Sequence, residues 1–350
     1  MRIAISTDCW YPQLNGIAYT LDFTIRELKA MGHEVLLISP RDFPSVPTPW
    51  YKDDPIVMAW YPALRRKLDA FAPDHVHIAT QGILGLVTRF WCWRRKAAFS
   101  TAFHTRFPEY AKVRHGIPEG LLYWYLRRFH GRGAPVLVPS RALADELAAH
   151  GFTNLELWAR GVDSGRFRPR SKTWTAYPRP IFMYVGRIAD EKNVEAFLAA
   201  DTGGSKVVIG EGPQLDALKK KYPAAHYLGA KYDEELAACY AEADVLAFPS
   251  LLDTFGLVVL EALASGVPVA CLPSPHLVEI FASHGVVAFD EDLGTACRRA
   301  LTILPDACRA VALKFSWRAC TENFLRIVVE ATPGGGRGAG SGRAGPIPPP

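Results

Sequence analysis

Residues 248–269 of this 350-residue chain read FPSLLDTFGLVVLEALASGVPV. A β-like run ends at Pro249, and a loop carrying Asp253 follows it. The apolar residues after the loop predict a helix that starts near Phe255 and stops at Gly266. Strand, loop and helix in this order form the repeating unit of a parallel α/β sheet. The segment therefore predicts an α/β fold, and the rest of the chain can be tested against the same pattern.

The start of this predicted helix offers groups that suit a nucleotide. The first N–H groups of a helix have no acceptor within it, so those of Phe255, Gly256 and Leu257 suit a diphosphate. Gly256 also lets the backbone approach a ligand closely. Glu261, further along the helix, can accept hydrogen bonds from ribose hydroxyls, as acidic residues do in dinucleotide sites. The alternative is an ordinary strand-to-helix turn in which Glu261 only complements the helix dipole.

Short β-branched runs alternate with helical patterns on both sides of this segment, which predicts two doubly wound parallel sheets. In the first half of the chain these runs cover residues 2–6, 35–39, 75–80, 97–104 and 135–140. In the second half they cover residues 181–186, 206–210, 225–228, 245–249, 267–272 and 286–289. The pattern lapses over residues 165–180, where we place a domain boundary. Ligands of such sheets bind beyond the carboxyl ends of strands, so we expect two Rossmann-like domains facing across a cleft.

We expect the first domain to span residues 1–168 and the second to span residues 178–312. A helix over about 315–331 has an apolar stripe and is expected to pack back on the first domain. Residues 332–350 are mostly Gly, Arg, Ala and Pro, and we expect them to form a disordered tail.

The composition fits two folded cores, since 49% of the residues are hydrophobic and 21% are charged. The seven cysteines form an odd set without a C-x-x-C spacing. This argues against a disulfide framework or a zinc site and favours a reducing compartment. No apolar run of about 18 residues predicts a transmembrane helix, and the N-terminus lacks a signal-peptide pattern. We therefore expect a cytoplasmic protein.

Positive charge is concentrated in residues 61–132, which hold 13 Lys or Arg against four Asp or Glu. That balance of +9, in a chain of net charge +5, leaves −4 for all other residues. The asymmetry predicts that part of the first half binds an anionic partner.

Two predicted helices in this basic region combine aromatic and basic residues on one face. The faces consist of Trp93, Arg94 and Arg95 on one helix and of Trp124, Arg127 and Arg128 on the other. The residues expected to point inward on the second helix are Leu121, Leu122, Tyr125, Leu126 and Phe129. Such faces suit an anionic membrane on the cytosolic side, and a solvated basic face is the alternative. Nucleic acid is not expected, because no recognition motif accompanies the charge.

Three further segments follow predicted strands. In the segment VGRIADEKN over residues 185–193, Arg187 and Lys192 can clamp a pyrophosphate and neutralise the charge that grows on it. The alternative is a solvated helix start. The turn GEGP over residues 210–213 offers Glu211 as a ligand, although glycines after strands are mostly turn chemistry. His104 comes directly after a strand, where a lone His is usually structural.

The loop YPQLNG over residues 11–16 places Gly16 at the start of the first helix. Asn-Gly is also a common turn. Only one Gly is present, so the loop is not a dinucleotide-binding fingerprint.

Together these segments resemble retaining glycosyltransferase family four, which has a GT-B fold. The matching features are the two acids Asp253 and Glu261 ahead of EALASGVPV, and the patterns G-R-x-x-x-x-K-N, G-x-G-P, P-x-x-x-G and H-T-x-F-P-x-Y. The resemblance assigns donor binding to Gly16, Arg187, Lys192, Glu211, Asp253, Thr254, Phe255, Gly256, Leu257 and Glu261. It assigns catalysis to His104, Arg187, Lys192 and Asp253. The family usually has Glu where this chain has Asp253, so the resemblance defines the nucleotide better than the sugar.

The resemblance implies a retaining transfer of a hexose, with mannose favoured, from a nucleoside-diphosphate sugar to a lipid or glycan acceptor. The chain looks most like bacterial GDP-mannose-dependent α-mannosyltransferases and glycolipid synthases. No D-x-D pair stands where a metal–diphosphate bridge is needed, since Asp53-Asp54 falls in what we expect to be an unstructured loop. We therefore expect cations and a helix N-terminus in place of a metal cofactor. The alternatives are a nucleotide-sugar 2-epimerase and a non-catalytic nucleotide-sugar-binding protein.

Overall fold

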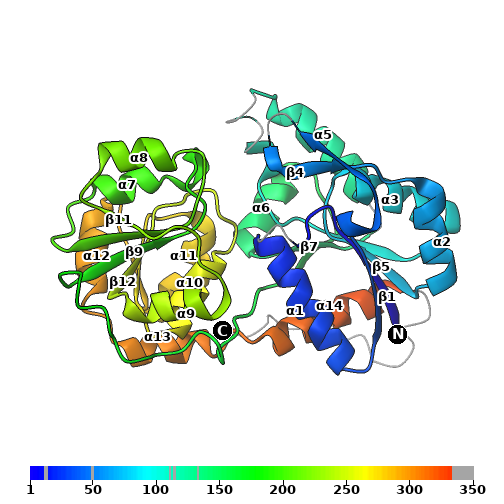
Figure 1. Ribbon diagram of the computed structural model, residues 1–350. Coiled ribbons are helices and arrows are strands. Elements are labelled where there is room, and N and C mark those ends of the chain that lie inside the picture. The colour runs from blue at the N-terminus through cyan, green and yellow to red at the C-terminus, as the bar shows by residue number, and fades with distance from the viewer. Residues whose placement is uncertain (12–14, 49–50, 110–111, 113–115, 132–133, 333–350) are drawn as a thin grey trace. The chain divides into compact units, whose positions relative to one another are not determined.

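A computed structural model describes residues 1–11, 15–48, 51–109, 112, 116–131 and 134–332. They form two compact units (Figure 1). Unit 1 comprises Met1–Ala159 together with the segment that begins at Trp317, and unit 2 comprises Arg160–Ser316. Each unit is built on a six-stranded sheet whose strands are all parallel, with helices on both faces. The predicted fold class is therefore confirmed.

The strands of the first sheet lie in the order β2-β1-β5-β6-β7-β8. They are β1 Arg2–Ser6, β2 Glu34–Ile38, β5 His75–Ile78, β6 Phe99–Ala102, β7 Val136–Val138 and β8 Leu155–Leu157. The helices are α1 Gly16–Ala30, α2 Tyr61–Phe71, α3 Ile83–Arg95, α5 Glu119–His130, α6 Arg141–Ala149 and α14 Trp317–Ala331, and a 3-10 turn covers Pro40–Asp42. Helices α2, α3 and α5 bury apolar side chains on one face of the sheet. Helices α1 and α14 lie side by side on the other face (Figure 1).

Two parts of unit 1 differ from the sequence prediction. Asp53 and Asp54, expected in an unstructured loop, lie in strand β4 Tyr51–Val57, which pairs antiparallel with β3 Ser45–Thr48. Each of these strands contains a proline, Pro47 or Pro55, and proline lowers the strand signal of a sequence. The short strand β8 was also missed, because three residues carry too little alternation to be recognised.

The strands of the second sheet lie in the order β11-β10-β9-β12-β13-β14. They are β9 Ile181–Val185, β10 Ser205–Ile209, β11 His226–Tyr227, β12 Val245–Phe248, β13 Val269–Cys271 and β14 Val287–Phe289. The helices are α7 Val194–Ala199, α8 Leu215–Lys221, α9 Asp233–Glu242, α10 Leu257–Ala264, α11 Pro275–Phe281, α12 Leu293–Ala300 and α13 Pro305–Ala312, with 3-10 turns at Asp190–Lys192 and Ala282–His284. The chain order reverses between β9 and β12. The loops after these two strands therefore meet at the point where sheets of this kind bind ligands.

The two ends of unit 2 are joined to each other. Val162 forms a parallel bridge with Ser316, and its N–H donates to the carbonyl of Phe315 at 2.9 Å. Phe167 and Phe315 both belong to the core of unit 2. Because residues 160–167 pack there, unit 2 begins earlier in the chain than the boundary that we placed at residues 165–180.

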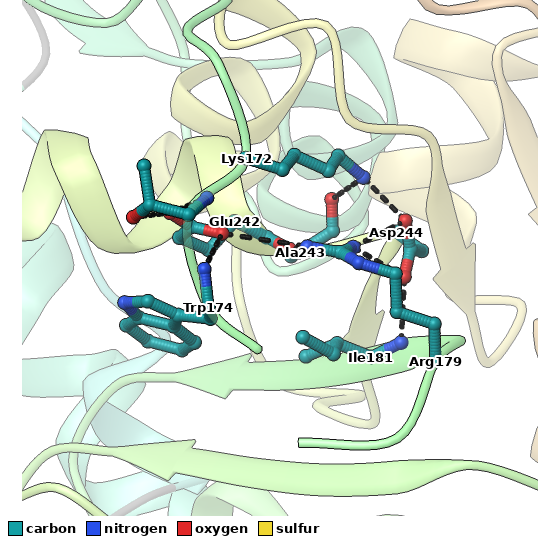
Figure 2. Close-up of polar contacts among 8 residues, drawn as sticks. Lys172, Trp174, Arg179, Ile181, Glu242, Ala243 and Asp244 are labelled. Atoms are coloured by element: carbon teal, nitrogen blue, oxygen red, sulfur yellow. Dashed lines mark hydrogen bonds and ion pairs between the residues drawn. The ribbon is translucent and has the colours of Figure 1, made fainter. Parts of the chain in front are cut away.

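The segment between residues 172 and 181 is tied to the end of α9 and the start of β12 (Figure 2). Glu242 accepts hydrogen bonds from the N–H groups of Thr173, at 2.7 Å, and Trp174, at 3.0 Å. Asp244 accepts from Arg179 at 2.8 Å. Burial acts to raise the pKa of Glu242, but these hydrogen bonds outweigh it and the pKa is lowered. The irregular segment thus has a fixed path along unit 2.

Helix α14 belongs to unit 1 although it follows unit 2 in the chain. It buries Cys320, Phe324, Ile327 and Val328, which are the residues of its predicted apolar stripe. Asn323 donates to the carbonyl of Leu157 at 2.7 Å and so fixes the helix beside β8. Of the predicted tail, residues 333–350 lie outside the described residues.

Candidate active site

The loops after β9 and β12 are joined by an ion pair. Lys192, at the end of the 3-10 turn after β9, places its Nζ 2.6 Å from Oδ1 of Asp253 in the loop after β12. The second oxygen of Asp253, Oδ2, is buried and has no hydrogen-bond partner among the described residues. The chain thus brings together two residues that lie 61 positions apart. A cation and a carboxylate at this point form the centre of a candidate donor site.

Close backbone contacts hold the neighbouring loops in place. The N–H of Gly186 donates to Ile209 at 3.0 Å, and that of Ile188 donates to the carbonyl of Glu211 at 2.8 Å. A Cβ on Gly210 would lie 1.9 Å from the carbonyl oxygen of Gly186. The G-x-G-P turn is therefore needed for packing, whatever else it does. The side chain of Glu211 is exposed, and its role as a ligand stays a prediction.

Helix α10 begins at Leu257, two residues later than the sequence predicted. Its N-cap is Gly256 with φ of +77°, a left-handed conformation that glycine adopts without strain. The N–H groups that lack an acceptor within the helix therefore start at Leu257 rather than at Phe255. The side chain of Phe255 is instead buried, with its ring 6.4 Å from that of Phe315. Thr254, just ahead, is buried as well.

Glu261 on α10 is 9% exposed, and the hydroxyl of Tyr240 donates to its Oε2 at 2.9 Å. Burial raises the pKa of Glu261 to about 7, against the hydrogen bond from Tyr240 and the charge of Arg166, which lower it. One oxygen of the Glu261 carboxylate is thus held by a hydrogen bond from α9, inside unit 2. Sequence reasoning missed Tyr240, because a buried aromatic residue on a helix is usually part of the core.

Arg187 follows β9 and has an exposed side chain. The backbone of this residue is fixed from inside the unit, because its carbonyl accepts a hydrogen bond from the hydroxyl of Tyr184 at 2.7 Å. Arg187 and Lys192 therefore lie on one ordered loop, as the clamp hypothesis requires.

In unit 1 the chain order reverses between β1 and β5, and the loops after these strands also meet. Asp8 accepts from the N–H of Leu84 at 2.8 Å and from the hydroxyl of Thr80 at 2.7 Å. A Cβ on Gly82 would lie 2.5 Å from Cγ of Asp8, so a larger residue there would displace the Asp8 carboxylate. Sequence reasoning missed this cap of α3, which joins residues far apart in the chain.

Gly16 is the first residue of α1, and Asn15 is its N-cap. The side-chain oxygen of Asn15 accepts from the N–H groups of Ile17, at 3.0 Å, and Ala18, at 2.9 Å. The local geometry is thus an ordinary helix cap, and a ligand role for Gly16 stays a prediction. Residues 12–14 of this P-x-x-x-G loop lie outside the described residues.

His104 follows β6 and is half-buried, with its ring 5.8 Å from that of Trp158. The loop after it is fixed at two points. Arg106 pairs with Glu146 of α6 at 2.8 Å, and the hydroxyl of Tyr123 donates to Glu109 at 2.5 Å. Tyr110, the last residue of the predicted motif, lies outside the described residues.

Comparison with known proteins identifies the family. Residues 14–166 match the model of Glycosyltransferase Family 4, and residues 179–304 match that of Glycosyl transferases group 1. A GDP-mannose-dependent alpha-mannosyltransferase of Corynebacterium glutamicum is 33% identical over 77% of this chain and 71% of its own length. The chain belongs to glycosyltransferase family 4. This is a family of retaining hexosyltransferases, so the chain is a glycosyltransferase that takes its sugar from a nucleotide sugar.

One further sequence relative and one solved structure resemble this family-4 chain. The alpha-monoglucosyldiacylglycerol synthase of Streptococcus pneumoniae is 26% identical over 94% of the chain and 85% of its own length. Sucrose-phosphate synthase from Thermosynechococcus elongatus superposes with a TM-score of 0.74 at 18% identity, over 93% of this chain and 98% of that one. At that identity the likeness shows the fold alone, which is GT-B.

The basic region of the glycosyltransferase carries exposed aromatic residues. Trp93 on α3 is 67% exposed and Trp124 on α5 is 56% exposed. Leu121, which we expected to point inward, is 59% exposed, and Tyr123 is buried in its place. The inward stripe of α5 is Tyr123, Leu126, Phe129 and His130. Leu121 lies two positions before that stripe, on the opposite side of the helix.

The arginines of the region differ in what they contact. Arg95 pairs with Asp69 at 2.5 Å, and Arg127 donates to the carbonyl of His150 at 2.8 Å. Arg94 and Arg128 are exposed. None of the helices in the described part of the chain is long and apolar enough to cross a membrane.

Proposed function

We propose that this enzyme transfers a mannosyl group, with retention, from a nucleoside-diphosphate donor to a lipid or glycan acceptor, without a metal cofactor. The proposal is supported by the GDP-mannose-dependent alpha-mannosyltransferase that is 33% identical to the chain. The observation that carries it is the Lys192–Asp253 pair at 2.6 Å, between the two loops where the chain order of the sheet reverses. We further propose that unit 2 binds the donor and unit 1 the acceptor.

In the proposed donor complex the N-terminus of α10 binds the diphosphate, together with Arg187 and Lys192. Negative charge accumulates on the diphosphate as the glycosidic bond breaks, and the two cations neutralise it where other enzymes use a metal. Asp253 binds hydroxyls of the sugar, and Glu261 binds the ribose. The assignments of Gly16 to donor binding and of His104 to catalysis, which the family resemblance implies, are part of this proposal. Since no carboxylate nucleophile is assigned, retention is proposed to follow front-face displacement guided by the departing phosphate.

A thermal-shift panel of GDP, UDP, GDP-mannose and UDP-glucose tests the donor. A ligand that binds only the native state at about 100 times its Kd adds about 2.7 kcal/mol of stability. We expect GDP and GDP-mannose to raise Tm by several degrees, and the uridine compounds to have a smaller effect. In the Glu261→Ala variant the shift should disappear. A larger shift with UDP than with GDP would contradict the assignment of the base.

We also propose that α3 and α5 contact an anionic membrane that holds the acceptor. Besides Trp93, α3 exposes Ile83, Leu86 and Phe90, which recur along one side of the helix. The guanidinium carbon of Arg94 lies 5.9 Å from the ring centre of Phe90, and Arg128 of α5 is exposed. An exposed face that combines aromatic and basic residues suits anionic lipid. The relative from Streptococcus pneumoniae is named as a synthase of a glucosylated diacylglycerol, which is a lipid.

Flotation with lipid vesicles tests this contact. The protein should float with vesicles of phosphatidylcholine and about 30% phosphatidylglycerol, and much less with phosphatidylcholine alone. Replacing Trp93 by Glu should reduce the bound fraction several-fold. Leu304→Glu is the matched control, because Leu304 is a 71% exposed apolar residue in unit 2. Equal losses in the two variants, or equal binding to both vesicle types, would refute the proposal.

A further inference from the structure

Helix α9 supports the carboxylate of Glu261 from inside unit 2. Tyr240 on α9 is fully buried, and its hydroxyl donates to Oε2 of Glu261 at 2.9 Å. The Tyr240 ring packs edge-on against Phe167 with the ring centres 5.7 Å apart. A ring enclosed in this way keeps one rotamer, so its hydroxyl donates from a fixed position.

Three side chains act on Glu261 or on the helix that carries it. Besides Tyr240 of α9, Arg166 acts on the carboxylate through its charge, while its guanidinium pairs with Asp233 at 2.7 Å. Arg309 of α13 binds the backbone carbonyl of Ala264 at 2.6 Å, near the end of α10. The hydrogen bond from Tyr240 is thus a direct side-chain contact to the carboxylate.

We propose that Tyr240 is a positioning residue for the donor: it holds Oε2 of Glu261 and so presents Oε1 to a ribose hydroxyl. The proposal rests on the assignment of Glu261 as the ribose ligand, which belongs to the proposed function. An unsupported carboxylate would rotate about its last side-chain torsion, and binding the ribose would have to restrict that rotation. Tyr240 removes this cost before the donor arrives.

Donor binding should therefore depend on pH. Ribose hydroxyls donate hydrogen bonds, and an ionised carboxylate accepts them better than a protonated one. Burial raises the pKa of Glu261 to about 7, so part of the enzyme is protonated near neutrality. Donor affinity should rise as pH increases through about 7 and level off above it. Removing the hydroxyl of Tyr240 takes away an interaction that lowers this pKa. The increase in donor affinity should therefore occur at a higher pH.

The Tyr240→Phe variant tests the proposal in steady-state assays across pH 6 to 9. We expect the donor KM at pH 7 to increase about ten-fold, kcat to change less than two-fold, and the inflection of the KM profile to move upward. Tyr222→Phe is the matched control: it removes a tyrosine–glutamate hydrogen bond of 3.0 Å, to Glu195, elsewhere in unit 2. A donor KM and pH profile equal to those of the control would overturn the positioning role.

Two further variants keep the test decisive. If Tyr240→Phe lowers Tm, the Glu261→Gln variant tests the pH linkage instead. An amide does not ionise in this range, so the donor KM of this variant should not change between pH 6 and 8. A sloping profile in that variant would overturn the pH linkage. Glu261→Ala tests the ribose role of Glu261 separately from the positioning role of Tyr240. Unchanged donor binding in Glu261→Ala would refute the ribose assignment itself. If Glu261→Ala loses donor binding while Tyr240→Phe keeps a wild-type donor KM, only the role of Tyr240 is refuted.

Discussion

Replacing Lys192 by alanine is expected to lower kcat/KM for sugar transfer by about 10²–10³-fold while the fold survives. The Nζ of Lys192 is fixed 2.6 Å from Asp253, so its charge is already in place when the donor phosphate begins to leave. A preorganised charge of this kind acts mainly on the transition state, and its removal should therefore appear in kcat. Initial rates over a range of donor concentrations measure the effect.

The Lys192→Ala variant also leaves Asp253 without its partner. Because Oδ2 of Asp253 already lacks a hydrogen-bond partner among the described residues, a moderate fall in Tm is expected as well. The double variant Lys192→Ala with Asp253→Asn removes the isolated charge. It should recover most of the lost Tm and none of the activity. Transfer at the wild-type rate by Lys192→Ala would rule out the proposed clamp.

Replacing Gly210 by alanine is expected to destabilise unit 2 by more than about 4 kcal/mol, or to prevent folding. The new Cβ would lie 1.9 Å from the carbonyl oxygen of Gly186, and both partners are backbone atoms that cannot move independently. The φ of Gly210 is +140°, which disfavours alanine further. Urea unfolding measures the loss of stability.

Gly229→Ala is the matched control for this substitution. Gly229 also has a positive φ, +71°, but nothing lies within 4 Å of a Cβ built there. Its cost should be the backbone strain alone, about 1–2 kcal/mol. Similar losses at the two positions would mean that the close approach of the loops after β9 and β10 does not contribute.

Strand patterns predicted most of this fold. The six runs identified in residues 178–312 correspond to β9–β14, because buried parallel strands are continuous apolar runs that stand out from helices. The hairpin β3–β4 was missed because each of its strands contains a proline, which weakens the strand pattern of the sequence. Leu121 was misplaced because two overlapping stripes fit the sequence of α5, and only the packing of Tyr123 selects one of them.

The candidate site was predictable mainly from residues that follow strands. Lys192 and Asp253 each stand after a strand, and sheet topology brings such loops together. Tyr240 had no such signal, because it lies within helix α9 and supports Glu261 through a contact across the fold. The conformation of Gly256 moved the start of α10 by two residues, which a hydrophobic pattern cannot resolve.

The joined ends of unit 2 bear on the order in which the protein folds during synthesis. Residues 160–316 form one continuous stretch in which Val162, near its start, is bridged to Ser316 at its end, so unit 2 has all of this stretch once Ser316 has left the ribosome. Unit 1 still lacks α14 at that moment, and with it Phe324, which contacts His77 of the central strand β5. We therefore expect the second half of the sequence to reach its native state first, with the N-terminal sheet remaining incomplete until the last helix emerges.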